Sequence, residues 1–260
     1  MSKKDLGAAV NWEAKKFIPI PLEEVILDWK IIEELLAENK EKEQKVKMKG
    51  AKMFRLLLTA ASRNLVKRYL EIFRLANLQL LALETEAFAL ARALVGKEET
   101  SIMIIDSSAV STDVIVIEKG IPVLNRSIDV GGVTITRAIA NCLNIDFKRA
   151  EQFKRDIGLT GVSRIPAMIE QTLKPVVDEV NYSLKLYQEQ TGQVVERVVL
   201  SGGSAYLPNL AEYFTKILNV KTFVGDPWAR ISYPTDLKPA LEEIAPRFAV
   251  AIGLALRGLE

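Results

Sequence analysis

The chain has 260 residues, of which 49% are hydrophobic and 26% charged, and its formal net charge is +2. This length allows a full core in two lobes, and the near-neutral charge gives no electrostatic case for binding nucleic acid. The sequence contains no histidine and one cysteine, Cys142, which excludes Ser-His triads, His metal sites, a thiolate zinc cluster and an internal disulfide.

The first 83 residues are predicted to form a compact α+β unit. Apolar residues at helical spacing open it, and Pro19 and Pro21 end that helix because proline cannot continue the backbone ladder. The dense charge of residues 38–52 predicts a solvated hairpin loop. The elements expected around this loop are a helix over 5–16, strands over 24–33 and 54–61, a helix over 64–77 and a strand over 78–83.

The rest of the chain is predicted to alternate strands and helices. Residues 101–117 form two antiparallel strands around a Ser-rich turn, and Pro227, Pro234 and Pro239 mark an irregular loop. The remaining expected elements are helices over 84–94, 133–142, 147–157, 165–190, 207–218 and 246–259, and strands over 121–128, 194–200 and 220–224.

A strand, a Ser-Gly-Gly turn and a helix start follow one another over residues 198–210. Gly202 and Gly203 carry no Cβ, so the backbone can bend sharply between Ser201 and Ser204 and approach a flat ligand. A helix start after such a turn offers free N–H groups, which suit the base and phosphate of a nucleotide. The alternative is a tight turn between strand and helix that binds no ligand.

Asp106 ends an apolar strand, and a run of hydroxyl-bearing residues follows it. A carboxylate at this place can hold a hydrated Mg²⁺, while hydroxyls and turn amides can face phosphate. The alternative is a polar hairpin turn without a ligand. The nucleotide-binding candidates of this segment are Asp106, Ser107, Ser108, Ser111 and Thr112.

Two further pairs of residues are candidates for nucleotide contacts. Gly131 and Gly132 precede a helix, where they can face phosphate or simply form its N-cap. Glu151 and Lys154 lie three positions apart, so both project from one face of a helix. They can grip the ribose and the base edge, or form a surface ion pair.

The order of these motifs resembles the second half of the actin-like ATPase fold. In that resemblance, Asp106–Thr112 is similar to the second phosphate loop, and Ser201–Pro208 to the adenosine motif. Ala249–Ala255 is similar to the closing helix that packs on the first lobe. The implied fold class is α/β, an actin-like (ribonuclease H-like) two-lobe fold.

Longer segments resemble the PilM family of type IV pilus assembly proteins, which is similar to FtsA. These segments are Asn11–Trp29, Leu83–Leu94 and Ala245–Gly258. The resemblance implies an FtsA-type α+β subdomain inserted in the first lobe. The implied division is 1–83 for the insert and its link, 84–100 for a first-lobe helix, 101–244 for the second lobe and 245–260 for the returning C-terminal helix.

Two features of the sequence depart from the pattern of the PilM family, and a third residue matches a family position. No Asp-x-Gly followed by small residues precedes Asp106, so we expect the first phosphate loop to be missing and the first lobe to be incomplete. Ser107 stands where glycine is usual, and its Cβ would crowd phosphate. Glu86 matches the family position near the attacking water, or it complements the dipole of a helix start.

The resemblance implies an adaptor of the inner-membrane pilus assembly complex. It would bind the cytoplasmic N-terminal peptide of the membrane protein PilN in a groove beside the insert, with self-association or docking on the pilus motor as further contacts. ATP and Mg²⁺ are the expected ligands, with reduced affinity and negligible turnover. The candidate groove residues, which core packing would also explain, are Trp12, Phe17, Ile18, Phe54, Leu56 and Leu58.

Other functions remain as alternatives. The chain would be an active actin-like ATPase if its cleft were complete, or an adaptor of a related secretion or cell-division system. No apolar run approaches the roughly 20 residues that span a bilayer, and the basic N-terminus lacks an apolar signal region. We therefore expect a cytoplasmic protein that reaches the membrane through its partner, rather than one anchored by its terminal helix.

Overall fold

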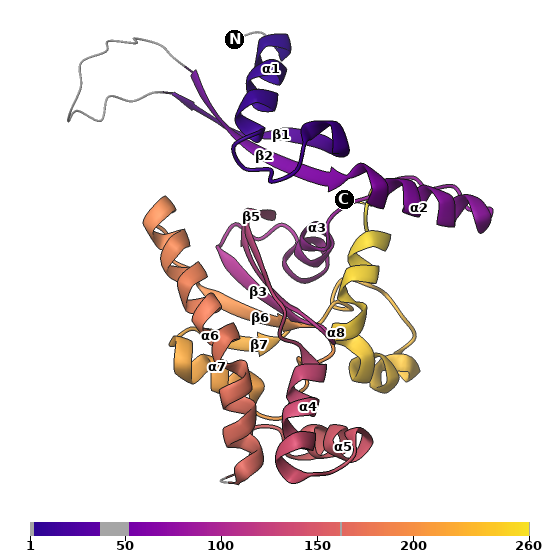
Figure 1. Cartoon of the computed structure of the whole chain (residues 1–260), viewed down its shortest axis with the longest axis vertical. Coiled ribbons are helices and arrows are strands. Elements are labelled where there is room, and N and C mark those ends of the chain that lie inside the picture. Colours follow the sequence, from indigo (N-terminus) through magenta and orange to yellow (C-terminus); the bar gives the residue numbers. More distant parts are fainter. Residues whose placement is uncertain (1–2, 37–51, 162, 260) are drawn as a thin grey trace. The chain divides into compact units, whose positions relative to one another are not determined.

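A computed structural model describes residues 3–36, 52–161 and 163–259 (Figure 1). The chain divides into two compact units, Met1–Leu83 and Glu84–Glu260, which we call unit 1 and unit 2. Within the described residues, none of the helices has the length and apolar character needed to cross a membrane.

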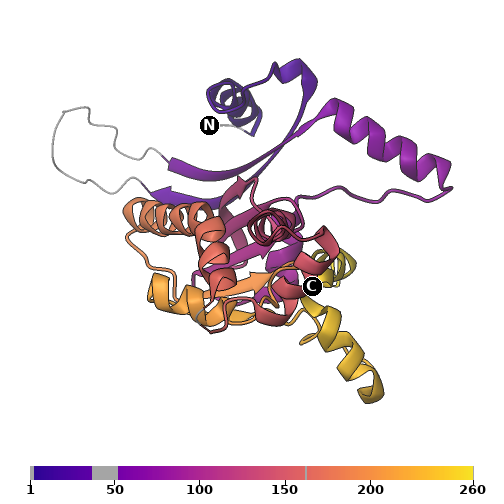
Figure 2. The ribbon, with the colours of Figure 1, turned by 60° about the horizontal axis from the view of Figure 1, so that its bottom comes forward.

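Unit 1 is built on a long β-hairpin. Helix α1 (Lys3–Ala14) and a short 3₁₀ turn, η1 (Leu22–Glu24), precede strand β1 (Val25–Leu36), which pairs antiparallel with β2 (Lys52–Ser62). Helix α2 (Arg63–Leu75) follows directly, and Figure 2 shows it extending away from the hairpin. Most of the predicted loop over 38–52 lies outside the described residues.

The strand predicted over residues 78–83 is wrong. The Leu78 N–H donates to the Phe73 carbonyl and closes α2, after which the chain is extended but pairs with no described strand. Leu78 and Leu81 are mostly exposed. An apolar run becomes a strand only when another strand satisfies its backbone, and the described residues supply none here.

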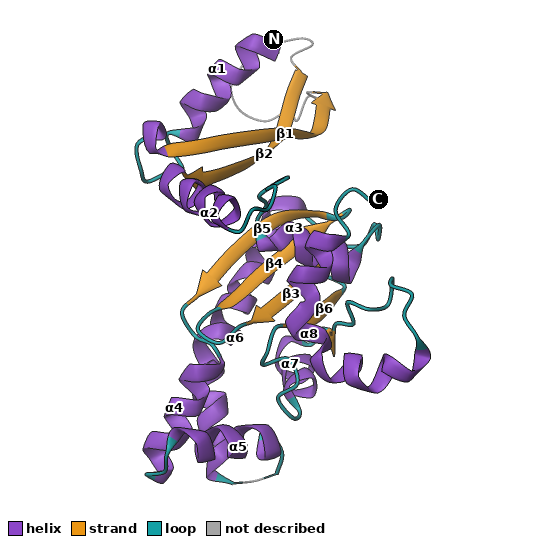
Figure 3. Cartoon of the chain, turned by 90° about the vertical axis from the view of Figure 1, so that its right-hand side faces the viewer, coloured by secondary structure: helices purple, strands orange, loops and turns teal. Residues whose placement is uncertain are grey.

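Unit 2 is a five-stranded sheet covered on both faces (Figure 3). Its strand order is β5-β4-β3-β6-β7, with antiparallel pairing from β5 to β3 and parallel pairing from β3 to β7. The strands are β3 (Ile102–Ser107), β4 (Thr112–Glu118), β5 (Ile121–Ile128), β6 (Arg197–Ser201) and β7 (Lys221–Val224).

The helices of unit 2 form the two outer layers. One face of the sheet packs on α4, α5, α6 and α7, and the other packs on α3 and α8. The helical elements are α3 (Glu86–Leu90), the π-helical turn η2 (Ala91–Val95), α4 (Gly132–Leu143), α5 (Phe147–Ile157), α6 (Arg164–Thr191), α7 (Leu210–Leu218), the 3₁₀ turn η3 (Thr235–Leu237) and α8 (Lys238–Ala255).

The central strand β3 shows how the sequence builds both layers at once. Met103 and Ile105 belong to the core under α4, α6 and α7, whereas Ile102 and Ile104 belong to the core under α3 and α8. Successive strand residues point to opposite faces, so a strand buried on both sides must be apolar at every position. The polar residues that end β3 are therefore delivered to opposite faces as well.

Two predictions in the second half of the chain are wrong because they treated proline as incompatible with a helix. The last helix was expected at 246–259, but α8 begins at Lys238 and contains Pro246. Pro239, expected in an irregular loop, lies in the first turn of α8, where proline is tolerated because its missing N–H would be unpaired anyway. The helix predicted over 84–94 is divided between α3 and the π-helical turn η2.

Candidate functional site

Three carboxylates meet at the end of the central strands of unit 2. Asp106 is the next-to-last residue of β3, Asp113 lies opposite it on β4, and Glu86 is the first residue of α3. One carboxylate oxygen from each lies within 4.8 Å of the others. Asp106 and Glu86 are separate site candidates in the sequence, and the fold brings their carboxylates together.

Burial dominates the electrostatics of this acidic cluster. Asp106 is buried, and this burial raises its pKa to about 6 from the ordinary 3.8. A hydrogen bond with Ser201 opposes the rise, while the nearby charges of Glu86 and Asp113 add to it. A divalent cation would favour the ionised form of Asp106 and so lower its pKa. Carboxylate oxygens are the ligands that Mg²⁺ prefers.

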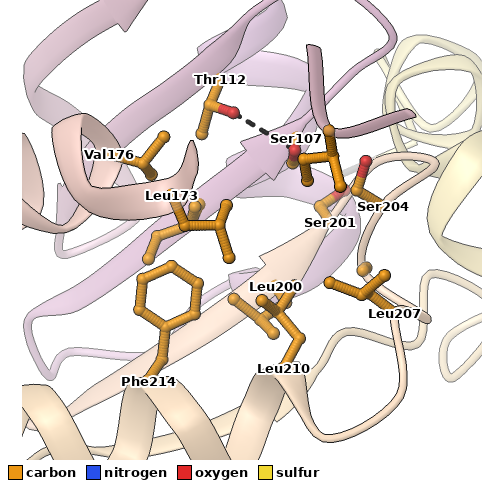
Figure 4. Close-up of a pocket in the computed structure, with 13 residues that line it drawn as sticks. Ser107, Thr112, Leu173, Val176, Leu200, Ser201, Ser204, Leu207, Leu210 and Phe214 are labelled. Atoms are coloured by element: carbon orange, nitrogen blue, oxygen red, sulfur yellow. Dashed lines mark hydrogen bonds between the residues drawn. The ribbon is translucent and has the colours of Figure 1, made fainter. Parts of the chain in front are cut away.

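Ser107 lies on the other face of the sheet from Asp106. It lines a small apolar cavity together with Thr112, Ser201 and Ser204 (Figure 4). The cavity volume is about 10 Å³, which is room for one water molecule and not for a nucleotide. The side chains of Asp106 and Ser107 therefore lie on opposite sides of the sheet and cannot both contact a nucleotide from the same side.

The hydroxyl groups of the predicted second phosphate loop already have hydrogen-bond partners within the protein. The Ser108 Oγ accepts from the N–H groups of Val110 and Ser111, at 3.3 and 3.1 Å, and lies 3.1 Å from the Ser111 Oγ. The Thr112 Oγ1 donates to the Val130 carbonyl at 2.6 Å. The loop is thus a self-bonded hairpin turn, and a phosphate would have to displace these bonds.

The Gly131-Gly132 pair brings the start of α4 against this loop. The N–H groups of Gly132 and Val133 donate to the carbonyls of Ser108 and Ala109, both at 2.9 Å. A Cβ on Gly131 would lie 2.6 Å from the Ala109 backbone, so glycine is needed for this close approach. The helix N–H groups expected to face phosphate are occupied by the loop.

Glu151 and Lys154 form the predicted pair on α5, at a distance of 2.7 Å. The buried Lys154 Nζ also donates to the Gly132 carbonyl at 3.1 Å and to the Thr136 Oγ1 at 3.0 Å. Burial opposes ionisation of Glu151, but the bonds from Lys154 and Thr136 outweigh it and hold the pKa of Glu151 below its usual value. This pair joins α4 to α5.

The Ser201–Ser204 loop packs directly on the end of β3. Gly202 has a φ of +83°, and a Cβ there would lie 2.3 Å from the Ser107 carbonyl oxygen. The Ser204 N–H donates to the same oxygen at 3.2 Å. A Cβ at Gly203 would meet no atom within 4 Å. The helix expected from residue 207 begins only at Leu210, so its N-terminus does not immediately follow the glycines.

The predicted peptide-groove residues lie on different faces of unit 1. Val10 and Ala14 of α1 are buried, whereas Trp12, two positions from each, is 63% exposed and lies 4.3 Å from the Lys16 Nζ. On the hairpin, Leu56 and Leu58 are half-buried and pair with Ile31 and Trp29 on a single face.

The other predicted groove residues surround the ends of these elements. Phe17 and Ile18 form the turn after α1, and both of their N–H groups donate to the Ala14 carbonyl. Phe17 is 77% exposed, whereas Ile18 is half-buried. Phe54 lies in β2, but its side chain is outside the described residues. An apolar partner can therefore reach Phe17 without opening the core of unit 1.

Asp113 is a member of the acidic cluster that was not predicted from the sequence. The signal was available in the hairpin register, because β3 and β4 pair Ser107 with Thr112 and hence Asp106 with Asp113. Residues directly opposite in an antiparallel pair project from the same face. A four-residue turn between Ser107 and Thr112 would have placed the two carboxylates together.

Comparisons with known proteins agree with this architecture. A family model described as "Type IV pilus assembly protein PilM" matches residues 1–259. A solved PilM-PilN type IV pilus biogenesis complex contains a chain 30% identical to this one, with a TM-score of 0.80, covering 100% of this chain and 74% of that chain.

Two more distant structures share the actin-like fold. MreB5 of Spiroplasma citri bound to AMPPNP is 18% identical, with a TM-score of 0.59, over 76% of this chain and 65% of that chain. The ethanolamine utilization protein EutJ from Carboxydothermus hydrogenoformans is 25% identical, with a TM-score of 0.53, over 76% of this chain and 62% of that chain. The fold is therefore that of actin-like ATPases, and the chain belongs to the PilM family of type IV pilus assembly proteins.

Proposed function

We propose that the chain is an adaptor in type IV pilus assembly that binds the N-terminal peptide of a PilN-like inner-membrane protein. The observation that carries this proposal is the match to a PilM chain solved as a complex with PilN. Binding to that peptide would hold the chain on the cytoplasmic side of the inner membrane without a membrane helix of its own.

The surface of unit 1 supports the capture of an extended apolar peptide. Phe17 and Trp12 are largely exposed, and Ile20 in the following loop is 41% exposed. Among the described residues β1 and β2 pair only with each other, so each strand keeps one unpaired edge. Such edges accept an extended peptide through main-chain hydrogen bonds, while exposed apolar side chains select its residues.

Titration calorimetry with the synthetic N-terminal peptide of the organism's own PilN-like protein tests this proposal. We expect saturable binding, weakened about tenfold by Phe17→Ser, since losing one well-buried apolar contact costs roughly 1–2 kcal/mol. Val194→Ser is the matched control, because Val194 is 60% exposed in unit 2. The absence of binding at high micromolar peptide, or equal weakening by both variants, would contradict the proposal.

A second candidate function is nucleotide binding beside the acidic cluster, with low affinity. The cluster of Glu86, Asp106 and Asp113 favours a nucleotide-bound Mg²⁺ at this place. The nucleotide contacts predicted for Lys154 and for the start of α4 are already engaged, because these groups bond within the protein. A nucleotide must replace those bonds, so we infer weak binding and negligible turnover.

Fluorescence titration with a labelled ATP analogue and Mg²⁺ measures this second function. We expect weak binding that is further weakened by Asp106→Asn and unchanged by Val194→Ser. Binding that is independent of Asp106 would remove the acidic cluster from the site. Steady ATP hydrolysis that Asp106→Asn abolishes would instead establish an enzyme.

A further inference from the structure

Helix α8 is interrupted chemically at Pro246. Proline has no N–H, so the carbonyl of Glu242, four residues earlier, receives no hydrogen bond from position 246. The hydroxyl of Tyr206 donates to this Glu242 carbonyl. Tyr206 lies just after the Ser201–Ser204 loop, so the donor that the helix lacks comes from the candidate site.

The Pro246 carbonyl receives the second contact between loop and helix. The Gly202 N–H donates to the Pro246 oxygen at 3.1 Å, and the Ser201 Oγ lies 3.4 Å from it. The loop is bonded on its other side to the Ser107 carbonyl through the Ser204 N–H. It is therefore held between the end of β3 and the proline of α8.

The part of α8 beyond Pro246 packs on α3, the helix whose first residue is Glu86. Gly253 packs so closely on α3 that a Cβ there would lie 1.9 Å from the Ala89 oxygen. Arg92 donates to the Gly253 carbonyl at 2.6 Å. The segment of α8 after Pro246 therefore contacts the helix that begins with Glu86, while Pro246 itself contacts the Ser201–Ser204 loop.

We propose that Tyr206 is a positioning residue whose hydroxyl replaces the N–H missing at Pro246. This hydrogen bond couples the Ser201–Ser204 loop to α8 at the proline. A nucleotide that orders this loop would then also fix the position of α8 around Pro246. A tyrosine hydroxyl is protonated at neutral pH and can donate, and burial, with the charges of Asp226 and Glu242, raises the pKa of Tyr206 further.

A double-mutant cycle of Tyr206→Phe and Pro246→Ala tests the coupling. Alanine restores an N–H that can donate to the Glu242 carbonyl, so the hydroxyl should then be dispensable. We expect Tyr206→Phe to accelerate amide exchange over residues 201–206 about threefold to tenfold with Pro246 present, and less than twofold in the Pro246→Ala background. Equal acceleration in both backgrounds, or none in either, would overturn the proposal.

Matched variants separate positioning from ordinary stability. Tyr182→Phe is the tyrosine control, because the Tyr182 ring stacks on Arg126 at 5.2 Å, far from α8 in the sequence. Pro175→Ala is the proline control, since Pro175 is the interior proline of α6. Neither control should change exchange over 201–206, and a change of similar size in either would count against a specific role for Tyr206.

The ligand part of this inference rests on the proposed nucleotide function. With AMPPNP and Mg²⁺, we expect Tyr206→Phe to weaken binding about threefold when Pro246 is present and not in the Pro246→Ala background. If no nucleotide binds, the nucleotide function fails, and the amide-exchange cycle in the free protein still decides the coupling. Equal weakening in both backgrounds would contradict the coupling while leaving nucleotide binding intact.

Discussion

The two units of the chain differ in how they treat apolar side chains. In unit 2, both faces of the sheet are buried under helices, and the core includes Phe214 and Leu90 at 1% and 0% exposure. Among the described residues of unit 1, the buried apolar side chains are Val10, Ala14 and Val25, while many large ones remain exposed. Unit 2 thus stabilises itself, whereas unit 1 offers apolar surface for contacts beyond its own residues.

The largest expected effect contrasts a core residue of unit 2 with an exposed residue of unit 1. Phe214→Ala should lower the free energy of unfolding of unit 2 by roughly 3–5 kcal/mol, because it leaves a cavity in a packed core. Leu75→Ala in α2 should change stability by less than about 0.5 kcal/mol, since Leu75 is 71% exposed.

Urea unfolding measures this contrast when each unit has its own reporter. With Trp12 and Trp29 replaced by phenylalanine, Trp228 reports on unit 2, and the converse replacement reports on unit 1. If Leu75→Ala lowered the free energy of unfolding by several kcal/mol, the apolar face of α2 would already be covered. The two units would then not differ in how they treat apolar side chains.

The same contrast explains which predictions from sequence succeeded. The elements of unit 2 were largely predictable because its strands are apolar at successive positions and its helices carry apolar stripes that the sheet buries. The run at 78–83 is also mostly apolar, but a strand needs a partner, and composition does not reveal one. The early start of α8 was missed because Pro239 and Pro246 signal breaks unless neighbouring groups are known.

The candidate site was predictable residue by residue but not as an arrangement. Asp106 and the glycine pairs stand near element ends that the sequence marks, and Glu151 and Lys154 share one face of a predicted helix. Whether their polar groups are free depends on distant contacts, such as the bond from the Lys154 Nζ to the Gly132 carbonyl. Such contacts join residues far apart in the chain and have no local signal.

The second prediction concerns the pH dependence of unit 2. The folded-state pKa of Asp106, about 6, exceeds the unfolded value of 3.8, so the folded state binds more protons between these values. The stability that comes from protonated Asp106 is fully present below about pH 4 and is lost as the pH rises through 6. Asp106→Asn should remove this loss, on the order of 2–3 kcal/mol at pH 7.

Urea unfolding at pH 4 and pH 7 checks this expectation as a difference between wild type and Asp106→Asn. Other carboxylates titrate in both proteins, so only the difference belongs to Asp106. Added Mg²⁺ should stabilise the wild type at pH 7 and leave the variant unchanged, because the cation favours ionised Asp106. If the free energies of unfolding of the two proteins changed equally with pH, the raised pKa of the buried Asp106 would be contradicted.

The third prediction compares a glycine in a helix of each unit. A Cβ at Gly253 of α8 would lie 1.9 Å from the Ala89 oxygen, whereas a Cβ at Gly7 of α1 meets no atom within 4 Å. Gly253→Ala should therefore destabilise unit 2 by roughly 1–3 kcal/mol through overpacking. Gly7→Ala should stabilise unit 1 by about 0.5–1 kcal/mol, because alanine favours the helix. Thermal unfolding that moves in the same direction for both would contradict the tight packing of α8.

The smallest effect contrasts two helix starts. Asp146 caps α5 by accepting from the Arg149 N–H at 3.0 Å, whereas Ser62, at the start of α2, makes no side-chain cap bond. Asp146→Ala should cost about 1 kcal/mol in the unfolding of unit 2, and Ser62→Ala only a few tenths in unit 1, because only the first removes a bond from an otherwise unpaired N–H. If the Ser62 variant cost as much, its hydroxyl would cap α2 in solution, and the start of this helix would be as tightly specified as those of unit 2. Unit 1 would then differ from unit 2 in the apolar surface it leaves exposed, and not in how firmly its helices are formed.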